Sequence, residues 1–168
     1  MKKMDFQKEL NMNYSIREIK KEEYRVLNDF LYEAIYIPVG MKKPSKEIIK
    51  KDELQVYIKD FGTKEGDYCL VALVDDLIVG ACWSRIMNDY GHIDDSTPSL
   101  AISLYFEYRG KGIGKALLSN MLKLLKEKGY EKVSLAVQKE NYAVKLYKSL
   151  NFKVIDENKE EYIMVCNL

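Results

Sequence analysis

Residues 103–117 read SLYFEYRGKGIGKAL, an apolar stretch that runs through a glycine-rich turn into a long helical pattern. Leu100 to Phe106 has the composition of a buried strand. Gly112 to Lys128 places apolar residues at helical spacing, and Gly129 follows in the position expected for a helix stop. A strand that enters a helix directly through glycines is the feature from which the rest of the fold can be worked out.

The turn itself has the properties of an anion site. The first turn of a helix has unpaired backbone N–H groups and the positive end of the helix dipole. Glycines without Cβ atoms let an anion approach those N–H groups closely. Between residues 107 and 132 there are seven Lys or Arg against three Glu, which favours a phosphorylated ligand. A turn that only connects strand to helix, with lysines solvating the helix, remains the alternative.

Two common phosphate loops are excluded by spacing. The P-loop needs a glycine where Arg109 stands and Ser or Thr where Ala116 stands. The dinucleotide fingerprint needs a third glycine three residues after Gly112, where Lys115 stands, and a following βαβ half.

The same residues resemble the acyl-CoA loop of the GNAT superfamily, Arg/Gln-x-x-Gly-x-Gly/Ala. Arg109, Gly112 and Gly114 fill this motif in order. The chain departs from the family pattern at Phe106, where a proline is common. The resemblance extends over nearly the whole chain and implies a ligand, acetyl-CoA, whose pyrophosphate is held by the turn.

A second segment, Val133 to Phe152, is similar to the family's strand-Asn-x-x-Ala-x-x-Leu-Tyr-x-x-x-Gly-Phe element. Asn141 and Tyr147 occupy the matching places, with Ala143 one residue early. Asn141 is also a good N-cap, and capping is its expected main role. Asn151 replaces the usual glycine after the helix, and Asn is the next-best residue for a left-handed position there.

The fold class that follows is α+β, a mixed and mostly antiparallel central sheet flanked by helices. Its order is β-α-α-β-β-β-α-β-α-β-β, and the resemblance implies a splayed strand pair that binds acyl-CoA. Residues 1–13 are predicted as an N-terminal arm and 14–168 as a single domain. The expected strands are 14–19, 68–74, 78–87, 100–106, 133–137, 152–155 and 162–166. The expected helices are 20–36, a short one after Ser45, 52–59, 112–128 and 142–150.

By resemblance the protein transfers an acetyl group from acetyl-CoA to a primary amine of a small molecule or peptide. A catalytically inactive acyl-CoA-binding module is the alternative. The end of the splayed strand would pair with the pantetheine arm, and the turn would hold the pyrophosphate. The expected cofactor-binding residues are Leu104, Tyr105, Phe106, Arg109, Gly110, Lys111, Gly112, Ile113, Gly114, Lys115, Asn141 and Tyr147.

Tyr147 is the expected catalytic residue. Helical side chains lean toward the helix N-terminus, so its phenol points toward Asn141 and the open end of the sheet. The resemblance places the coenzyme sulfur there. A phenol of pKa about 10 is protonated at pH 7 and can serve the departing thiolate as general acid. An ordinary packed tyrosine is the alternative, since the chain has 13 tyrosines.

The base and the acceptor are left open. Asp94 and Asp95 precede the splayed strand and are candidates for the base, although paired acids in a polar loop are usually just solvated. The acceptor is expected to enter between the first two helices and the loop after the sixth strand. Tyr32 and Tyr36, predicted on one helix face, would line that pocket or belong to the core.

Composition limits the other classes. The chain has 168 residues, 47% of them apolar, and 27 Lys or Arg balance 26 Asp or Glu, so nothing indicates a nucleic-acid partner. No uncharged stretch is long enough to span a bilayer, and the N-terminus lacks a signal-peptide pattern, so no membrane partner is expected. Three scattered cysteines and one histidine favour no disulfide and no metal, and they fit the cytoplasm. A homodimer is left open.

Overall fold

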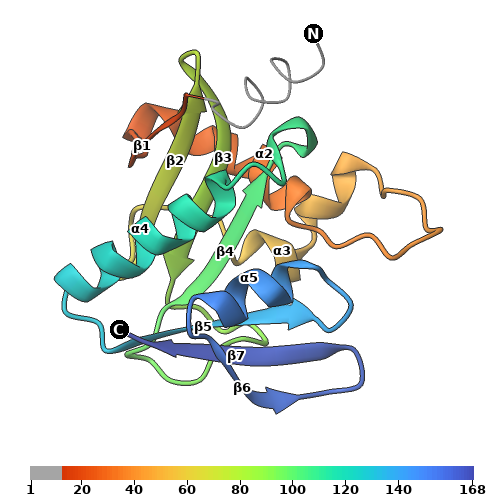
Figure 1. Ribbon diagram of the computed structural model, residues 1–168, viewed down its shortest axis with the longest axis vertical. Helices are drawn as coiled ribbons and strands as arrows, with labels where there is room; N and C mark the ends of the chain where they lie inside the picture. The colour runs from red at the N-terminus through yellow and green to blue at the C-terminus, as the bar shows by residue number, and fades with distance from the viewer. Residues whose placement is uncertain (1–12) are drawn as a thin grey trace, which may run out of the picture.

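The computed structural model describes residues 13–168, and a seven-stranded sheet runs through this part (Figure 1). The strands are β1 (Ser15–Glu18), β2 (Tyr68–Val74), β3 (Leu77–Arg85), β4 (Ser99–Leu104), β5 (Lys132–Gln138), β6 (Lys153–Glu157) and β7 (Glu161–Asn167). Their order is β1-β2-β3-β4-β5-β7-β6. Only β4 and β5 are parallel. The predicted mixed sheet is confirmed, whereas the predicted arm lies, except for Asn13, outside the described residues.

The hairpin that joins β2 to β3 follows from its turn residues. Asp75 and Asp76 both have positive φ, 49° and 64°. This is the conformation of a two-residue turn of the kind that matches the twist of the flanking strands. Asp is among the few residues that tolerate it. The sequence had predicted a turn here between two strands, and the structure agrees.

Helices cover both faces of the sheet (Figure 1). The helical elements are η1 (Lys21–Val26), α2 (Leu27–Glu33), η2 (Lys46–Lys50), α3 (Asp52–Gln55), η3 (Phe106–Tyr108), α4 (Ile113–Glu127) and α5 (Ala143–Ser149). On one face, called here the α4 face, Leu117 and Met121 pack with Cys82 and Val133. On the other, the α2 face, Phe30 packs with buried residues of β2 and β3. The sheet therefore separates two apolar cores.

The longest helix, α4, starts and stops at glycines. Gly112 precedes it with φ +85°, and Gly129 follows it with φ +93°. The N–H of Tyr130 donates to the carbonyl of Leu125 (3.1 Å), and that of Gly129 donates to Lys126 (3.0 Å). This pair of bonds is the Schellman motif, in which a left-handed glycine ends the helix. The predicted start and stop are confirmed within one residue.

Several predicted elements end earlier than expected, among them the helix predicted at 52–59, which ends at Gln55. Phe106 lies in the short helix η3 and not in a strand, and the ladder between β3 and β4 ends at the pair Gly80–Leu104. The first helix ends at Glu33, so Tyr36 does not share its face with Tyr32. Pro38 disfavours helical conformation in the residue before it, which is consistent with this early end.

Within residues 13–168, no helix combines the length and the apolar character that crossing a bilayer requires.

Candidate active site

The two parallel strands at the centre of the sheet touch only at one end. Ser99 of β4 pairs with Ser134 of β5, and the Ser134 N–H donates to the carbonyl of Pro98 (3.0 Å). Beyond this pair the strands separate toward their C-terminal ends, Leu104 and Gln138 (Figure 1). The result is a V-shaped break in the hydrogen bonding of the sheet, open at the end where the glycine turn begins.

At the open end of the V, the backbone N–H groups of β4 point alternately toward β3 and toward the gap between β4 and β5. The N–H of Tyr105 donates to the carbonyl of Val79 in β3 (2.9 Å), so it is already used. Because backbone groups alternate along a strand, the N–H of Leu104 faces the gap. Phe106, in the following helical turn, has 77% of its surface exposed. An extended ligand chain in the gap would find one free donor here, at Leu104.

The glycine turn presents a run of free backbone donors. None of the six N–H groups from Gly110 to Lys115 has an acceptor among the residues that the structure describes. The first bond of α4 comes after them, from the Ala116 N–H to the carbonyl of Gly112 (3.2 Å). Ile113 is fully buried and anchors the helix start to the core. Six consecutive donors at a helix N-terminus form a cradle for an anion.

The space above this cradle fits a phosphorylated ligand. A Cβ added to Gly110 or Gly112 would meet no protein atom within 4 Å, and both residues have positive φ. At Gly114 a Cβ would be 3.4 Å from Leu104, an ordinary contact. Lys111 and Lys115 form no ion pair with any residue from 13 to 168, so their charges are available to a ligand.

Arg109, the first residue of the motif, is used inside the protein. Its Nε donates to the carbonyl of Leu104 (2.9 Å), and a terminal nitrogen donates to the backbone carbonyl (3.2 Å) and carboxylate (3.1 Å) of Glu33. Lys43 pairs with the same carboxylate at 3.3 Å. Arg109 therefore ties the end of β4 to the end of α2. Glu33 could not be identified as its partner from local sequence patterns, because the two residues are 76 positions apart.

Asn141 acts as a cap in the structure. Its Oδ1 accepts a hydrogen bond from the N–H of Ala143 (2.9 Å), at the start of α5. The carbonyl of Asn141 accepts from Val144 (3.1 Å). This is the expected capping role, and it leaves the amide nitrogen of the side chain without a partner among the described residues.

Tyr147 lies on the buried side of α5, with 8% of its surface exposed. Its ring packs against Phe152, with 5.6 Å between the centroids. Its hydroxyl has no hydrogen-bond partner in the described part of the chain and is not among the polar atoms closed off from solvent. Burial, and to a lesser extent the nearby Cys82 and Tyr142, raise the pKa of this phenol. The hydroxyl therefore keeps its proton and remains available to a ligand.

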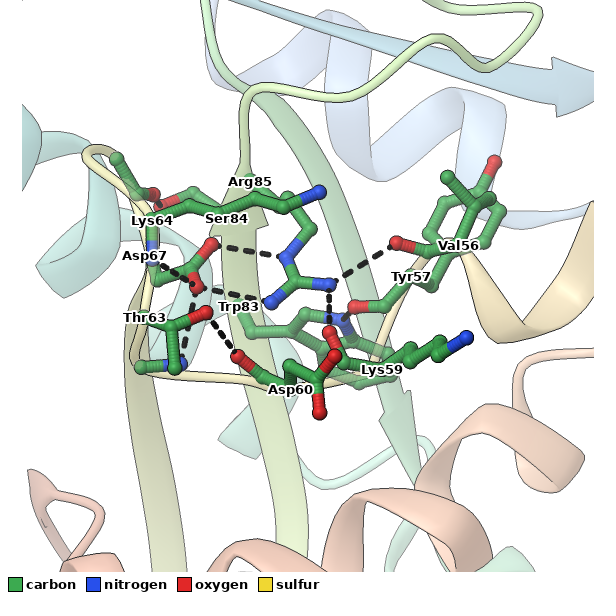
Figure 2. A network of polar contacts seen from close by, with 12 residues as sticks. Val56, Tyr57, Lys59, Asp60, Thr63, Lys64, Asp67, Trp83, Ser84 and Arg85 are labelled. Atoms are coloured by element: carbon green, nitrogen blue, oxygen red, sulfur yellow. Dashed lines mark hydrogen bonds and ion pairs between the residues drawn. The ribbon is translucent and has the colours of Figure 1, made fainter.

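A fully buried ion pair fixes the segment that lies against the α2 face between α3 and β2 (Figure 2). Arg85 and Asp67 form two hydrogen bonds of 2.9 Å, and both side chains are 1% exposed. The guanidinium also donates to the carbonyls of Val56 and Lys59, and the Trp83 indole donates to the carbonyl of Tyr57. The backbone around residue 57 is thereby held in place, and sequence reasoning missed this network.

Tyr57 links this network to the closed end of the V. Its ring extends away from Arg85 in Figure 2, and its hydroxyl donates to Asp89 (3.0 Å). The other oxygen of Asp89 accepts from the hydroxyl of Ser99 (3.0 Å), at the point where β4 and β5 meet. Burial, then the charge and hydrogen bond of Asp89, then the charge of Glu161 raise the pKa of Tyr57. A polar group of this kind beside the V was not predicted.

The loop acids considered as bases are placed less favourably. Hydrogen bonds from Thr97 and Ser96 and the ammonium of Lys132 hold the pKa of Asp94 below its usual range. The side chain of Asp95 is 98% exposed and pairs with His92. The carboxylate of Asp94 is therefore poorly suited to take a proton near neutral pH.

Tyr32 belongs to the core, which is one of the two interpretations that the sequence allowed for it. It is 9% exposed, and its hydroxyl donates to the carbonyl of Pro44. Lys43 lies over its ring at 4.4 Å. Tyr32 thus fastens the loop after α2, whereas Tyr36 lies beyond the helix.

Known proteins resemble this chain both in sequence and in fold. The profile of the acetyltransferase (GNAT) family matches residues 16–152. The [ribosomal protein bS18]-alanine N-acetyltransferase of Haemophilus influenzae is 35% identical over 68 residues, which is 40% of this chain and 47% of that protein. The match thus spans about half the length of that relative.

Two solved structures share the fold. The PaiA N-acetyltransferase of Thermoplasma acidophilum, in complex with coenzyme A, aligns over 94% of this chain and 100% of its own, with TM-score 0.67 and 23% identity. The phosphinothricin acetyltransferase of Sinorhizobium meliloti, in complex with acetyl-CoA, aligns over 94% and 89%, with TM-score 0.65 and 19% identity. With the family profile covering most of the chain, this protein belongs to the acetyltransferase (GNAT) family.

Proposed function

We propose that this protein transfers the acetyl group of acetyl-CoA to a primary amine of a small molecule or peptide. The observation that carries the proposal is the run of six free N–H groups from Gly110 to Lys115, at the open end of the V. A pyrophosphate needs many donors and little side-chain bulk, which this turn offers. The complexes of two neighbours with coenzyme A and acetyl-CoA support the same ligand.

Different residues around the V would bind different parts of acetyl-CoA. Leu104 would offer its N–H to the pantetheine arm, and the turn, with Lys111 and Lys115, would hold the phosphates. Arg109 would keep the turn against β4 through its bonds to Leu104 and Glu33, and its other terminal nitrogen, which has no partner among residues 13–168, would be available to the ligand. Tyr105 and Phe106 would contribute side-chain surface, because the N–H of Tyr105 is used by β3.

Tyr147 would act as the general acid. The leaving sulfur needs a proton or a strong hydrogen bond, and a positioned phenol can supply it. Burial keeps the proton of Tyr147 on its oxygen across the neutral range. The side-chain amide nitrogen of Asn141, at the start of the same helix, would contact the ligand arm. The three free, buried cysteines fit a cytoplasmic protein.

Two measurements test the proposal. Acetyl-CoA at 100 times its dissociation constant should stabilise the protein by about 2.7 kcal/mol, which for a chain of this size raises Tm by about 5–10 °C. Thiol release should then be followed with a panel of amines: a peptide with an N-terminal alanine, phosphinothricin, a polyamine and a lysine peptide. The first two probes come from the substrates that the names of its relatives state.

The outcomes separate the two functions considered. A thermal shift together with turnover of at least one amine supports the transferase. A shift without any turnover supports the inactive acyl-CoA-binding module. No shift at millimolar acetyl-CoA excludes both.

A further inference from the structure

One acidic side chain on the α2 face stands on the strand next to β5 and forms no ion pair with any residue from 13 to 168. Glu161 is the first residue of β7 and stands directly opposite Gln138, the last residue of β5. Directly opposed residues of antiparallel strands project from the same face of the sheet. Val133 and Leu135 face the α4 core, so Ser134, Gln138 and with them Glu161 face the other way. Glu161 therefore stands next to the arm of the V formed by β5.

The backbone and one oxygen of Glu161 are held in place. Its N–H donates to Oδ1 of Asn158 (2.7 Å), and its carbonyl accepts from the N–H of the same residue (3.0 Å). Gln138 donates to Oε1 of the carboxylate (3.0 Å). Oε2 has no hydrogen-bonding or ionic partner between residues 13 and 168. A fixed carboxylate with one free oxygen can receive a proton.

The surroundings favour the protonated form of Glu161 more than water does. Burial, and next the charge of Glu160, raise the pKa of the Glu161 carboxyl above its ordinary value. The charge of Glu161 is in turn felt by the Tyr57 phenol, which is bonded to Asp89. Glu160 and the Tyr57 phenol are thus titratable groups that interact with Glu161. A raised pKa brings a carboxylate closer to the value suited to general-base catalysis near neutral pH.

The other carboxylates on this face are occupied. Both oxygens of Asp89 accept hydrogen bonds, from Tyr57 and Ser99. Glu33 is paired with Arg109 and with a lysine. The pKa of Asp94 is held below its usual range, and the side chain of Asp95 is exposed to solvent. Glu161 alone of these groups combines partial burial, a fixed position and an unused oxygen.

We propose that Glu161 is the catalytic base of this enzyme, the group that takes the proton from the attacking amine, directly or through one water. The assignment rests on the proposed transferase function. The nitrogen lone pair forms the new C–N bond to the acetyl carbon, and the C–S bond breaks. One N–H proton of the amine goes to Oε2 of Glu161, and the hydroxyl of Tyr147 gives its proton to the departing sulfur. Solvent then returns the proton from Glu161 to Tyr147, so the net products are the acetamide and the free thiol.

The test compares Glu161→Gln with Glu160→Gln in the full-length protein. Glutamine keeps the shape of Glu161 and can still accept from Gln138, but it cannot take the proton. Glu160 is the matched control, an exposed carboxylate on the neighbouring residue. The probe is the amine of the panel that the wild-type protein acetylates fastest, and kcat and KM are measured from pH 5 to 9. Acetyl-CoA affinity is measured separately by calorimetry.

We expect Glu161→Gln to lower kcat by about 10²–10⁴-fold, with acetyl-CoA affinity within about twofold of wild type. The acid limb of the wild-type kcat profile should disappear in this variant, and Glu161→Asp should recover part of the rate. Glu160→Gln should keep kcat at its pH optimum within about threefold of wild type, with the acid limb moved to slightly lower pH, because the charge of Glu160 no longer raises the pKa of Glu161.

Three results would overturn the proposal. One is a kcat for Glu161→Gln within about threefold of wild type. Another is a raised KM with unchanged kcat, which would make Glu161 a binding group for the ammonium ion. The third is an equal loss in Glu160→Gln, which would indicate a general charge effect. Failure of the wild-type protein to acetylate any amine would refute the proposed function first, and the assignment of Glu161 with it.

Discussion

Gly112→Ala should weaken acetyl-CoA binding by about 10- to 100-fold. The new methyl group would meet no protein atom within 4 Å, so it would project into the space that the pyrophosphate needs. Loss of one hydrogen bond to a charged group costs about 1.5–3 kcal/mol. At 1.4 kcal/mol for each tenfold change, that loss gives the stated range in the dissociation constant.

The same substitution should also cost stability, for a separate reason. Gly112 has φ +85°, where a residue with a Cβ is strained by about 1–2 kcal/mol. For a chain of this length, each kcal/mol lowers Tm by roughly 2–4 °C, so the expected loss is about 2–8 °C. The two effects must be told apart, because a partly unfolded protein would also bind less ligand.

Gly129→Ala is the control that separates them. Gly129 stands at the other end of the same helix with φ +93°, and a Cβ there would also meet nothing within 4 Å. Both variants should lose similar stability in denaturant titrations, but only Gly112→Ala should lose affinity in calorimetry at a temperature where both are folded. Equal acetyl-CoA affinities for the two variants would show that the pyrophosphate does not lie over Gly112. The proposed pyrophosphate site at the glycine turn would then be wrong.

Other changes test the site and the fold. Tyr147→Phe should lower kcat by about 10²–10⁴-fold and leave acetyl-CoA affinity unchanged, and a matched loss of both in kinetics and calorimetry would instead make the hydroxyl a binding group. Asp67→Asn should cost about 3–5 kcal/mol in urea unfolding, because it leaves a buried guanidinium unpaired, whereas Glu47→Gln, in an exposed ion pair, should change little. The hydrogen bond from Arg17 lowers the pKa of Glu23 from 4.5 to about 2, so its stabilising effect is complete above pH 4.5 and is lost as the pH falls toward 2. Glu23→Gln should flatten that part of the stability curve, and an unchanged acid limb would contradict the assignment.

The sequence alone determined the features that depend on neighbours along the chain. The glycines around α4 and the Asp75–Asp76 turn were predicted correctly, because left-handed conformations restrict the residue types that can occupy them. The cap at Asn141 was predicted because its partner is two residues away. Strand and helix patterns were recognised for the same reason, since each repeats within a few residues. The boundary errors, such as those at Phe106 and after Glu33, were shifts at the ends of elements whose type had been predicted correctly.

Only the tertiary structure decided what surrounds the ends of those elements. Arg109 matched the family motif in the sequence, but only the folded chain brings its guanidinium to Glu33, 76 residues away. Tyr57 and Asp89, 32 residues apart, meet because the sheet brings their segments together. Glu161 became a candidate only through its register opposite Gln138. A hydrogen bond between distant residues depends on which segments the tertiary fold brings into contact. Local sequence patterns contain no information about those contacts.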